Sequence, residues 1–295
     1  MSITANMVKE LRDRTGAGMM ECKKALVEAE GDAEQAAEIL RKSGQAKADK
    51  KSGRIAADGR IVVAVDGSKA AVVEINSETD FVARDENFIA FSDAIAAAAL
   101  ETGVTDTEVM ADVSLSDGRT VEEARTDLIS KVGENISVRR IATLASDDVL
   151  ASYTHGSRIG VAVAMSGGDE ALARDLAMHI AASNPMCIDE AGVPAETLDS
   201  ERRILTEQAK ASGKPSDIVD KMVEGRLGKF LKEVTLLGQP FVKDPETSVG
   251  KLLGKAGATV TGFVRFEVGE GIEKREENFA DEVMKQVRDA AKSDK

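Results

Sequence analysis

The sequence predicts an α+β fold in which two similar core subdomains each carry a small antiparallel sheet covered by helices. The first observation is a change of hydrophobic period, from that of helices to that of strands, near Gly59. The second is that a hairpin, a helical stretch and a strand that follows a glycine occur twice along the chain. The third is a pair of helical patterns that interrupts the second copy over residues 185–234.

Residues 1–54 are predicted to form a helical module of three short helices followed by a linker. Thr15-Gly16-Ala17-Gly18 ends the first helix, Gly31 ends the second, and Asp32 can cap the third. One face of the second helix carries Met19, Cys22, Leu26 and Ala29. The stretch from Lys42 to Arg54 is rich in Lys, Ser, Gly and Ala, which predicts the linker.

Residues 55–143 are predicted to form the first subdomain. The turn signal Asp66-Gly67 separates two strand patterns, Ile61–Val65 and Ala70–Ile75, and so predicts a hairpin. After it we expect a helix through Phe88, Phe91 and Ile95 with room for a break near Asp85, a helix over about Val121–Val132, and a strand after Gly133.

Residues 144–184 and 235–270 are predicted to form the second, discontinuous subdomain. Its hairpin pairs Leu150–His155 with Ile159–Met165, and Asp169 caps the helix that follows. Residues 249–256 continue as a helix. The last strand is expected to place the following residues on one side: Val260, Val264, Phe266 and Val268.

Residues 185–234 are predicted to form a helical hairpin. Two amphipathic stretches, 194–211 and 216–234, flank the sharp turn Ser212-Gly213-Lys214-Pro215. Each has one narrow apolar seam and charged outer faces, which favours an antiparallel pair that protrudes and contacts a partner. The alternative is a pair that packs flat on the body.

The composition argues against direct binding of nucleic acid. The chain of 295 residues has 39 Lys and Arg against 52 Asp and Glu, a net charge of −13, and aromatic residues make up only 3%. Proteins that bind nucleic acid carry a basic patch, and those that bind single strands often add aromatic platforms. We therefore expect the partners to be proteins or small molecules.

The sequence also predicts a cytoplasmic protein that does not bind a membrane. The first residues mix acidic with basic side chains and contain no apolar run, unlike a signal peptide. The most apolar stretch, Ala94–Leu100, is too short to cross a bilayer. Cys22 and Cys187 lie far apart and form neither a disulfide framework nor a zinc pattern, so we expect reduced thiols.

Searches for catalytic, metal and cofactor motifs find no strong match. Neither His155 nor His179 has a second ligand at helical spacing, so no metal is expected. The glycines of Gly250–Gly254 are separated by three residues and Ala256 stands where a phosphate loop needs Ser or Thr, so no nucleotide cofactor is expected. A Cys187–His179 pair is kept only as an enzyme alternative.

Several long strings resemble one family, bacterial elongation factor Ts. They are residues 11–26 (LRDRTGAGMMECKKAL), Thr79-Asp80-Phe81-Val82-Ala83-Arg84, Gly133-Glu134-Asn135-Ile136, His155-Gly156-Ser157-Arg158-Ile159-Gly160, His179-Ile180-Ala181-Ala182, and Gly238-Gln239-Pro240-Phe241-Val242. The resemblance runs essentially the whole length of the chain.

The resemblance implies a guanine-nucleotide exchange factor for elongation factor Tu that acts in translation and has no catalytic groups of its own. It also implies an N-terminal module like a ubiquitin-associated domain, an inserted coiled-coil hairpin and a C-terminal helix. That helix is expected over residues 271–295, where Phe279, Val283 and Val287 have helical spacing.

In the family that this chain resembles, the segment matching Thr79 to Val82 displaces magnesium from the partner's nucleotide site. Ser77-Glu78-Thr79-Asp80 has capping-box spacing, which predicts a helix start that projects Phe81 from a firm base. Asp80 places an anion beside the ring. The resemblance further suggests partner contacts at Arg12 and His155. Met20, which lies off the apolar stripe of its helix, is also a candidate for surface contact.

Other readings remain open. Phe81 lies seven positions before Phe88, so on one continuous helix both rings would face the core. Met19 is expected on the apolar stripe of its helix, and His179 is expected to be buried. An adaptor that binds partners without exchange activity is the alternative function.

Overall fold

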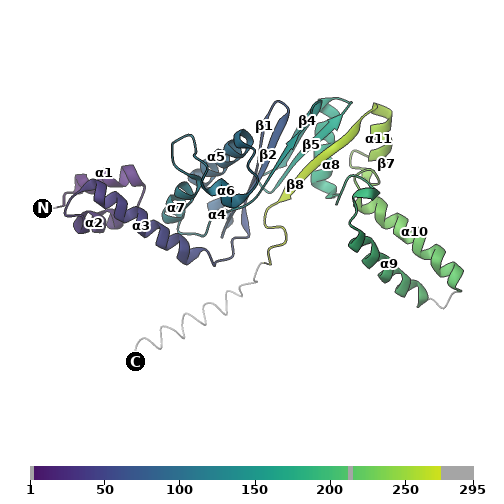
Figure 1. The fold of residues 1–295 in the computed structure, drawn as a ribbon, viewed down its shortest axis with the longest axis horizontal. Helices are drawn as coiled ribbons and strands as arrows, with labels where there is room; N and C mark the ends of the chain where they lie inside the picture. Colours follow the sequence, from purple (N-terminus) through teal and green to yellow (C-terminus); the bar gives the residue numbers. More distant parts are fainter. Residues whose placement is uncertain (1–2, 212–214, 274–295) are drawn as a thin grey trace.

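The computed structural model describes residues 3–211 and 215–273. Over these residues the two sheets pack on each other through their inner faces, and helices cover the outer face of each sheet (Figure 1). The predicted α+β class is confirmed. The N-terminal helices lie at one end of this layered body and a helical pair extends from the other end.

The N-terminal helices are α1 (Ala5–Thr15), α2 (Met19–Glu28) and α3 (Ala33–Lys51). They enclose a small core of their own, to which Leu11, Cys22 and Leu26 contribute buried side chains. The expectation that Met19 joins this core is wrong, because its side chain is 58% exposed. Met19 is the first residue of α2, and the stripe is covered only from Cys22 onward.

The linker expected over residues 42–54 is also wrong, because α3 continues as a helix to Lys51. Its second half packs on α7 (Val121–Val132), where a Cβ on Gly44 would lie 3.1 Å from Ser130 Oγ. Ala48 is fully buried in the core of the first subdomain. Small residues in α3 therefore allow α3 and α7 to approach closely. Composition alone does not distinguish such a packed helix from a linker, because both are rich in small residues.

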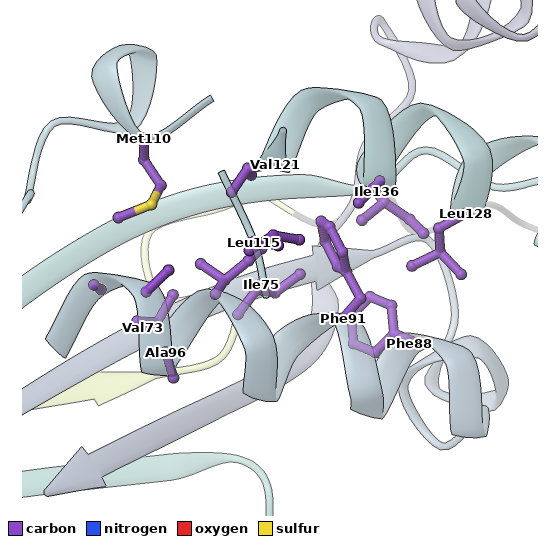
Figure 2. Packing of buried hydrophobic residues seen from close by; sticks show 14 of the residues in the cluster. Val73, Ile75, Phe88, Phe91, Ala96, Met110, Leu115, Val121, Leu128 and Ile136 are labelled. Carbon is purple, nitrogen blue, oxygen red and sulfur yellow. The ribbon is translucent and has the colours of Figure 1, made fainter. Parts of the chain in front are cut away.

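The first sheet has the order β1-β2-β3 and is antiparallel throughout. Its strands are β1 (Asp58–Asp66), β2 (Lys69–Ser77) and β3 (Ser137–Ala145), and its helices are α4 (Asp80–Ala83), α5 (Glu86–Thr102), α6 (Thr107–Ala111) and α7. Phe88 and Phe91 of α5 pack with Val73 and Ile75 of β2 in the core on the outer face (Figure 2). The predicted hairpin, the break near Asp85 and helix α7 are confirmed, whereas α6 was not predicted.

The second sheet repeats this plan with the order β4-β5-β8. Its strands are β4 (Val149–His155), β5 (Ile159–Ser166) and β8 (Thr259–Glu267), with α8 (Glu170–Ser183) and α11 (Val249–Ala256) on the outer face and a short pair, β6 (Pro240–Phe241) and β7 (Asp244–Ser248), beside them. The third strand of each sheet has a register shift, opposite Glu74 and Ile75 in one and Ala164 and Met165 in the other. This shared irregularity strengthens the inference that the two subdomains are repeats.

The residues expected on one side of the last strand lie on both sides. Ala164 pairs with Gly262 and Met165 pairs with Val260, so Thr261 is an extra residue that reverses the alternation. Val260 consequently faces the helices, whereas Val264 and Phe266 face the first sheet.

The two sheets contact each other through side chains from both inner faces. Ile61 and Val72 of the first sheet pack against Ala162 of the second and against Val268, which follows β8. The sheets approach closely at Gly160, where a Cβ would lie 2.5 Å from Ile61 Cγ2. A glycine is therefore needed at this crossing.

A buried carboxylate also joins the two subdomains. Glu74 of β2 is fully buried and accepts hydrogen bonds from Arg139 and Arg140 of β3 and from the Gly269 N–H, at 2.8 Å, after β8. The Arg140 guanidinium also stacks 4.2 Å from the centre of the Phe266 ring. Charge, hydrogen bonding and stacking thus meet where the end of β8 crosses the first sheet.

The inserted residues form α9 (Ala195–Lys210) and α10 (Ser216–Val234), preceded by the 3-10 turn η1 (Glu190–Gly192). Their seam is a separate cluster that includes Leu205, Val219, Val223 and Leu227. Figure 1 shows the pair extending away from the sheets and not lying flat on them. At its base the Met186 N–H donates to the Val234 carbonyl at 2.8 Å, so the two ends of the insertion are held together.

In the described part of the chain, no helix has the length and apolar character needed to cross a membrane. The helix expected over residues 271–295, with Phe279, Val283 and Val287, lies almost wholly outside the described residues.

Candidate functional site

The most exposed large apolar side chain in the described residues is Phe81, at 81%. It lies on the single turn of α4, which is separated by two residues from the end of β2, the central strand of the first sheet. Beside it Asp80 pairs with Arg84 at 2.9 Å, while Val82 packs partly on the core and Ala83 is buried. The turn therefore rests on the body through one side and presents the phenyl ring to solvent.

The cap of α4 is Thr79, not Ser77 as the capping-box spacing predicted. The Val82 N–H donates to Thr79 Oγ1 at 3.4 Å. Ser77 is still paired with Asp58 at the end of β2, so the backbone cannot turn into a helix until two residues later. The Ser77 hydroxyl instead donates to the Thr79 carbonyl at 2.9 Å.

A break between α4 and α5 separates Phe81 from Phe88. Asp85 caps α5 by accepting hydrogen bonds from the Asn87 and Phe88 N–H groups, at 2.8 and 3.4 Å. The hydrogen bond from the Asn87 side chain, together with these backbone bonds, lowers the pKa of Asp85. Because the two rings lie on different helices, Phe88 can be fully buried while Phe81 is exposed.

Glu134, in the loop before β3, holds the start of α4. Its carboxylate accepts from the Thr79 N–H at 3.0 Å and from the Thr79 hydroxyl at 2.7 Å. A bond also runs in the opposite direction, since the Asn135 N–H donates to Glu78 Oε1 at 2.6 Å. We call this pair of crossed contacts, Glu134 to Thr79 and Glu78 to Asn135, the carboxylate clasp.

The clasp also reaches the segment that follows α3. The Asn135 side-chain amide donates to the Arg54 carbonyl at 2.8 Å, and the Arg54 guanidinium lies 3.4 Å from Glu78. Asn135 is buried. The end of the N-terminal helices, the loop before β3 and the start of α4 therefore meet at one point.

The other candidate contact residues are exposed and lie on separate elements. Arg12 is on α1 and Met20 is the second residue of α2, where its side chain is 66% exposed. His155 ends β4, and its Nδ1 lies 3.2 Å from the Tyr153 hydroxyl. These residues are not gathered with Phe81 into one pocket, which suits contacts with a large partner at several points.

The Cys187–His179 alternative has no support in the geometry. Nδ1 of the buried His179 accepts from the Val242 N–H at 3.2 Å, and its Nε2 lies 3.0 Å from Gln239 Oε1, so both ring nitrogens are engaged. The Cys187 thiol donates to the Asp189 carbonyl at 3.1 Å. Burial and the charge of Asp189 raise the pKa of this thiol, which disfavours the thiolate that a nucleophile needs.

The structure also bears on the two other sites considered from the sequence, a metal site and a phosphate-binding loop. Within residues 3–211 and 215–273, no group of three His, Cys, Asp or Glu side chains is arranged to hold a metal ion. The stretch around Gly250 forms α11, which Ser248 caps by accepting from the Lys251 N–H. These residues therefore form a helix and not a phosphate loop.

Comparison with known proteins gives one consistent result. Residues 78–270 match the family model described as Elongation factor TS. An elongation factor Ts from Methylococcus capsulatus is 61% identical, covering 98% of this chain and 99% of that protein. The chain belongs to the elongation factor Ts family.

Other relatives agree with this assignment. Elongation factor Ts from Idiomarina loihiensis is 58% identical over 99% of this chain and 100% of that protein, and the one from Thioalkalivibrio sulfidiphilus is 59% identical over 98% and 100%. Membership of this family implies an exchange factor of translation elongation.

The sequence did not indicate the roles of two acidic residues, Glu134 at the start of α4 and Glu74 where the two sheets cross. Glu134 lies within Gly133-Glu134-Asn135-Ile136, a string that supports the family resemblance, so a signal was present without a role attached. Glu74 occupies a strand position between buried apolar residues, where a charged side chain is unusual.

Proposed function

We propose that this chain is a guanine-nucleotide exchange factor for elongation factor Tu that acts in the cytoplasm during translation elongation. It binds the GDP complex, displaces magnesium and promotes the replacement of GDP by GTP. Family membership supports the exchange role, and the geometry of α4 supports the step at the metal site.

The observation that carries the proposal is the exposure of Phe81 on an anchored helical turn. Burying a phenylalanine side chain in a partner gains about 1.5–3 kcal/mol, so leaving the ring in water has a cost that binding removes. The ring has few rotamers, and little conformational entropy is lost when it enters a pocket. Phe81 is therefore suited to act as a wedge between elements of elongation factor Tu.

Asp80 supplies a negative charge next to that wedge. Its ion pair with Arg84 joins two side chains that are 52% and 77% exposed, and exposed pairs of this kind are weak. The carboxylate is therefore free to turn toward a partner. Near a magnesium ion and phosphates, an added anion disturbs the balance of charge. An inserted ring displaces the groups that hold the ion and the phosphates.

Release of GDP follows from thermodynamic linkage. If the factor binds elongation factor Tu without GDP more tightly than the GDP complex, GDP must bind the factor-bound protein more weakly by the same ratio. The factor then needs no catalytic group. Rebinding of GTP restores the contacts that the wedge disturbs and expels the factor.

We further propose that Arg12, Met20 and His155 contact the partner at points away from α4. The proposed units are 1–54, 55–143, 144–184 with 235–270, the hairpin 185–234 and the terminal module 271–295. Of the contact residues, Met20 is the strongest candidate, because a flexible thioether exposed at a helix start adapts to many surfaces.

The test is release of a fluorescent GDP analogue from elongation factor Tu at saturating factor. We expect Phe81→Ala to slow the release by about 30- to 150-fold, which corresponds to about 2–3 kcal/mol for a hot-spot side chain. Val109→Ala, which trims an exposed side chain on α6 of the same subdomain, is the matched control and should keep the wild-type rate.

The alternative, an adaptor that binds without exchanging nucleotide, makes a different prediction. Wild type would then bind elongation factor Tu and leave its rate of GDP release unchanged. Such a result would sink the exchange proposal, whatever the affinity of the complex.

A further inference from the structure

The carboxylate clasp acts on a helix that cannot hold itself in place. α4 has four residues, and the cost of forming a first helical turn is not repaid within so short an element. The two bonds at its start are long, with 3.3 Å from the Ala83 N–H to the Thr79 carbonyl and 3.4 Å from the Val82 N–H to Thr79 Oγ1, and only at its end does the Asp85 N–H reach the Val82 carbonyl at 2.9 Å. The position of α4 therefore depends on contacts from outside the turn.

Glu134 supplies the strongest of these contacts. It takes both donors of Thr79, the backbone N–H and the hydroxyl, on its two carboxylate oxygens, at 3.0 and 2.7 Å. Hydrogen bonds to an ionised acceptor are about twice as strong as neutral ones. The two bonds converge on one residue from one rigid group, so they define the orientation of Thr79 and not only its distance.

The geometry also explains how this orientation reaches Phe81. A hydroxyl has one hydrogen and two lone pairs, and the hydrogen of Thr79 points to Glu134. A lone pair is thereby directed at the Val82 N–H, which completes the cap. Phe81 lies between the cap residue and the residue that it caps, so its backbone direction is set by the same bonds.

From these contacts we propose that Glu134 is a positioning residue for nucleotide exchange, which holds Phe81 in the direction in which it enters the partner. This inference rests on the proposed exchange function. The bond from the Asn135 N–H to Glu78 secures the same loop from the opposite side, so the loop and the segment 78–82 move as one unit.

The first test combines Glu134→Ala with Phe81→Ala in the assay of GDP release. We expect Glu134→Ala alone to slow maximal release about tenfold, less than Phe81→Ala does, because the ring is retained and only its orientation is loosened. In a chain that already carries Phe81→Ala, it should cause no further loss. Glu134→Gln retains one acceptor and should recover part of the rate.

Glu123→Ala is the matched control. Glu123 also accepts a hydrogen bond from the N–H of a threonine cap, Thr120 of α7, at 3.1 Å, but it does not touch α4. The variant should lower thermal stability through the loss of its cap bond and leave the release rate as in wild type. This comparison separates positioning from a general loss of stability.

Hydrogen exchange of the α4 amides tests the inference without the partner. Glu134→Ala should speed exchange at Val82 and Ala83 about tenfold, and Glu123→Ala should not. Unchanged exchange in α4, a wild-type release rate, or losses that multiply in the double variant would each overturn the positioning role. If wild type does not accelerate GDP release at all, the proposed function fails, and the exchange of the α4 amides still decides whether Glu134 holds the turn.

Discussion

His179 shows how much one buried side chain can organise. Its Nδ1 accepts from the Val242 N–H, so the proton of the neutral ring is on Nε2 and is donated to Gln239. The Gln239 amide then donates to the Ser183 and Glu233 carbonyls, at 3.2 and 2.8 Å. One polar chain thus connects α8, the end of α10 and the β6–β7 turn.

At the residue scale, stability should depend on pH through His179. Burial lowers the pKa of this ring, against the smaller effect of the Gln239 bond, so the unfolded chain takes up a proton more readily than the folded one. The free energy of unfolding is then highest above about pH 6.5 and falls as the pH decreases below it. When the free energy of unfolding is measured in urea at several pH values from about 7 to about 5, it should change less with pH in His179→Gln than in wild type.

The control for that experiment is His155→Gln, at an exposed position, which should retain the wild-type slope. Equal slopes in wild type and His179→Gln would show that the buried ring does not govern this dependence. His179→Ala should lower the free energy of unfolding by about 2–4 kcal/mol at pH 7, because it leaves a cavity and unpaired polar groups.

At the element scale, Glu74 connects β2 to β3 and to the residues after β8. Burial acts to raise the pKa of Glu74, but hydrogen bonds from the Gly269 N–H, Arg140 and Asn76 outweigh it and hold the pKa below the ordinary range. The register shift in β3 makes Arg139 the extra residue between Val138 and Arg140. Both neighbouring arginines can therefore reach one carboxylate.

Glu74→Gln should lower the free energy of unfolding by about 1–3 kcal/mol at pH 7, because the hydrogen bonds from Arg139, Arg140 and the Gly269 N–H lose their charged acceptor. Since the pKa of Glu74 is lowered in the folded state, this stabilisation is present above about pH 4.3 and is lost as the pH falls further. Denaturant titrations of wild type and Glu74→Gln at about pH 7 and at a pH below about 4.3 measure this loss of stabilisation.

Asp117→Asn is the matched control, since Asp117 pairs with Arg119 in an exposed setting and should cost about 0–1 kcal/mol. A loss in Glu74→Gln no larger than in this control would contradict a structural role for the buried charge.

At the scale of the whole molecule, the crossing of the two sheets decides how the subdomains sit together. Beside the apolar contacts, the Ile61 N–H of β1 donates to the Ser157 carbonyl in the β4–β5 turn at 2.8 Å. The β4–β5 turn is therefore bonded to the first sheet through its backbone, and His155, which begins this turn, takes its place relative to β1.

Gly160→Ala should weaken this crossing. Its Cβ would lie 2.5 Å from Ile61 Cγ2 and 2.8 Å from Val63 Cγ2, so the sheets must move apart, at a cost of about 1–3 kcal/mol. Gly254→Ala is the control, since the added Cβ meets no atom within 4 Å apart from its chain neighbours and the backbone of its own helix, and a helical alanine should leave stability equal or higher by about 0.5–1 kcal/mol. Equal stability of the two variants in urea would contradict the close contact.

Local patterns predicted the helices and strands that depend on neighbours in the chain. The turn after Asp66, the Asp169 cap and the spacing of Phe88 and Phe91 all indicated elements that the structure contains. Errors arose where a distant segment decides the outcome: α3 extends past Lys42 because α7 packs on it, and the faces of β8 change because of an extra residue.

The sequence by itself determined the α+β class, the repeated order of elements and the family, because hydrophobic period, turn residues and long strings are local properties. It also indicated Phe81 as the residue to test. Only the tertiary structure decided what holds that residue in place. Glu134 lies 55 positions from Thr79, and no local pattern reports a hydrogen bond between side chains that the fold alone brings together.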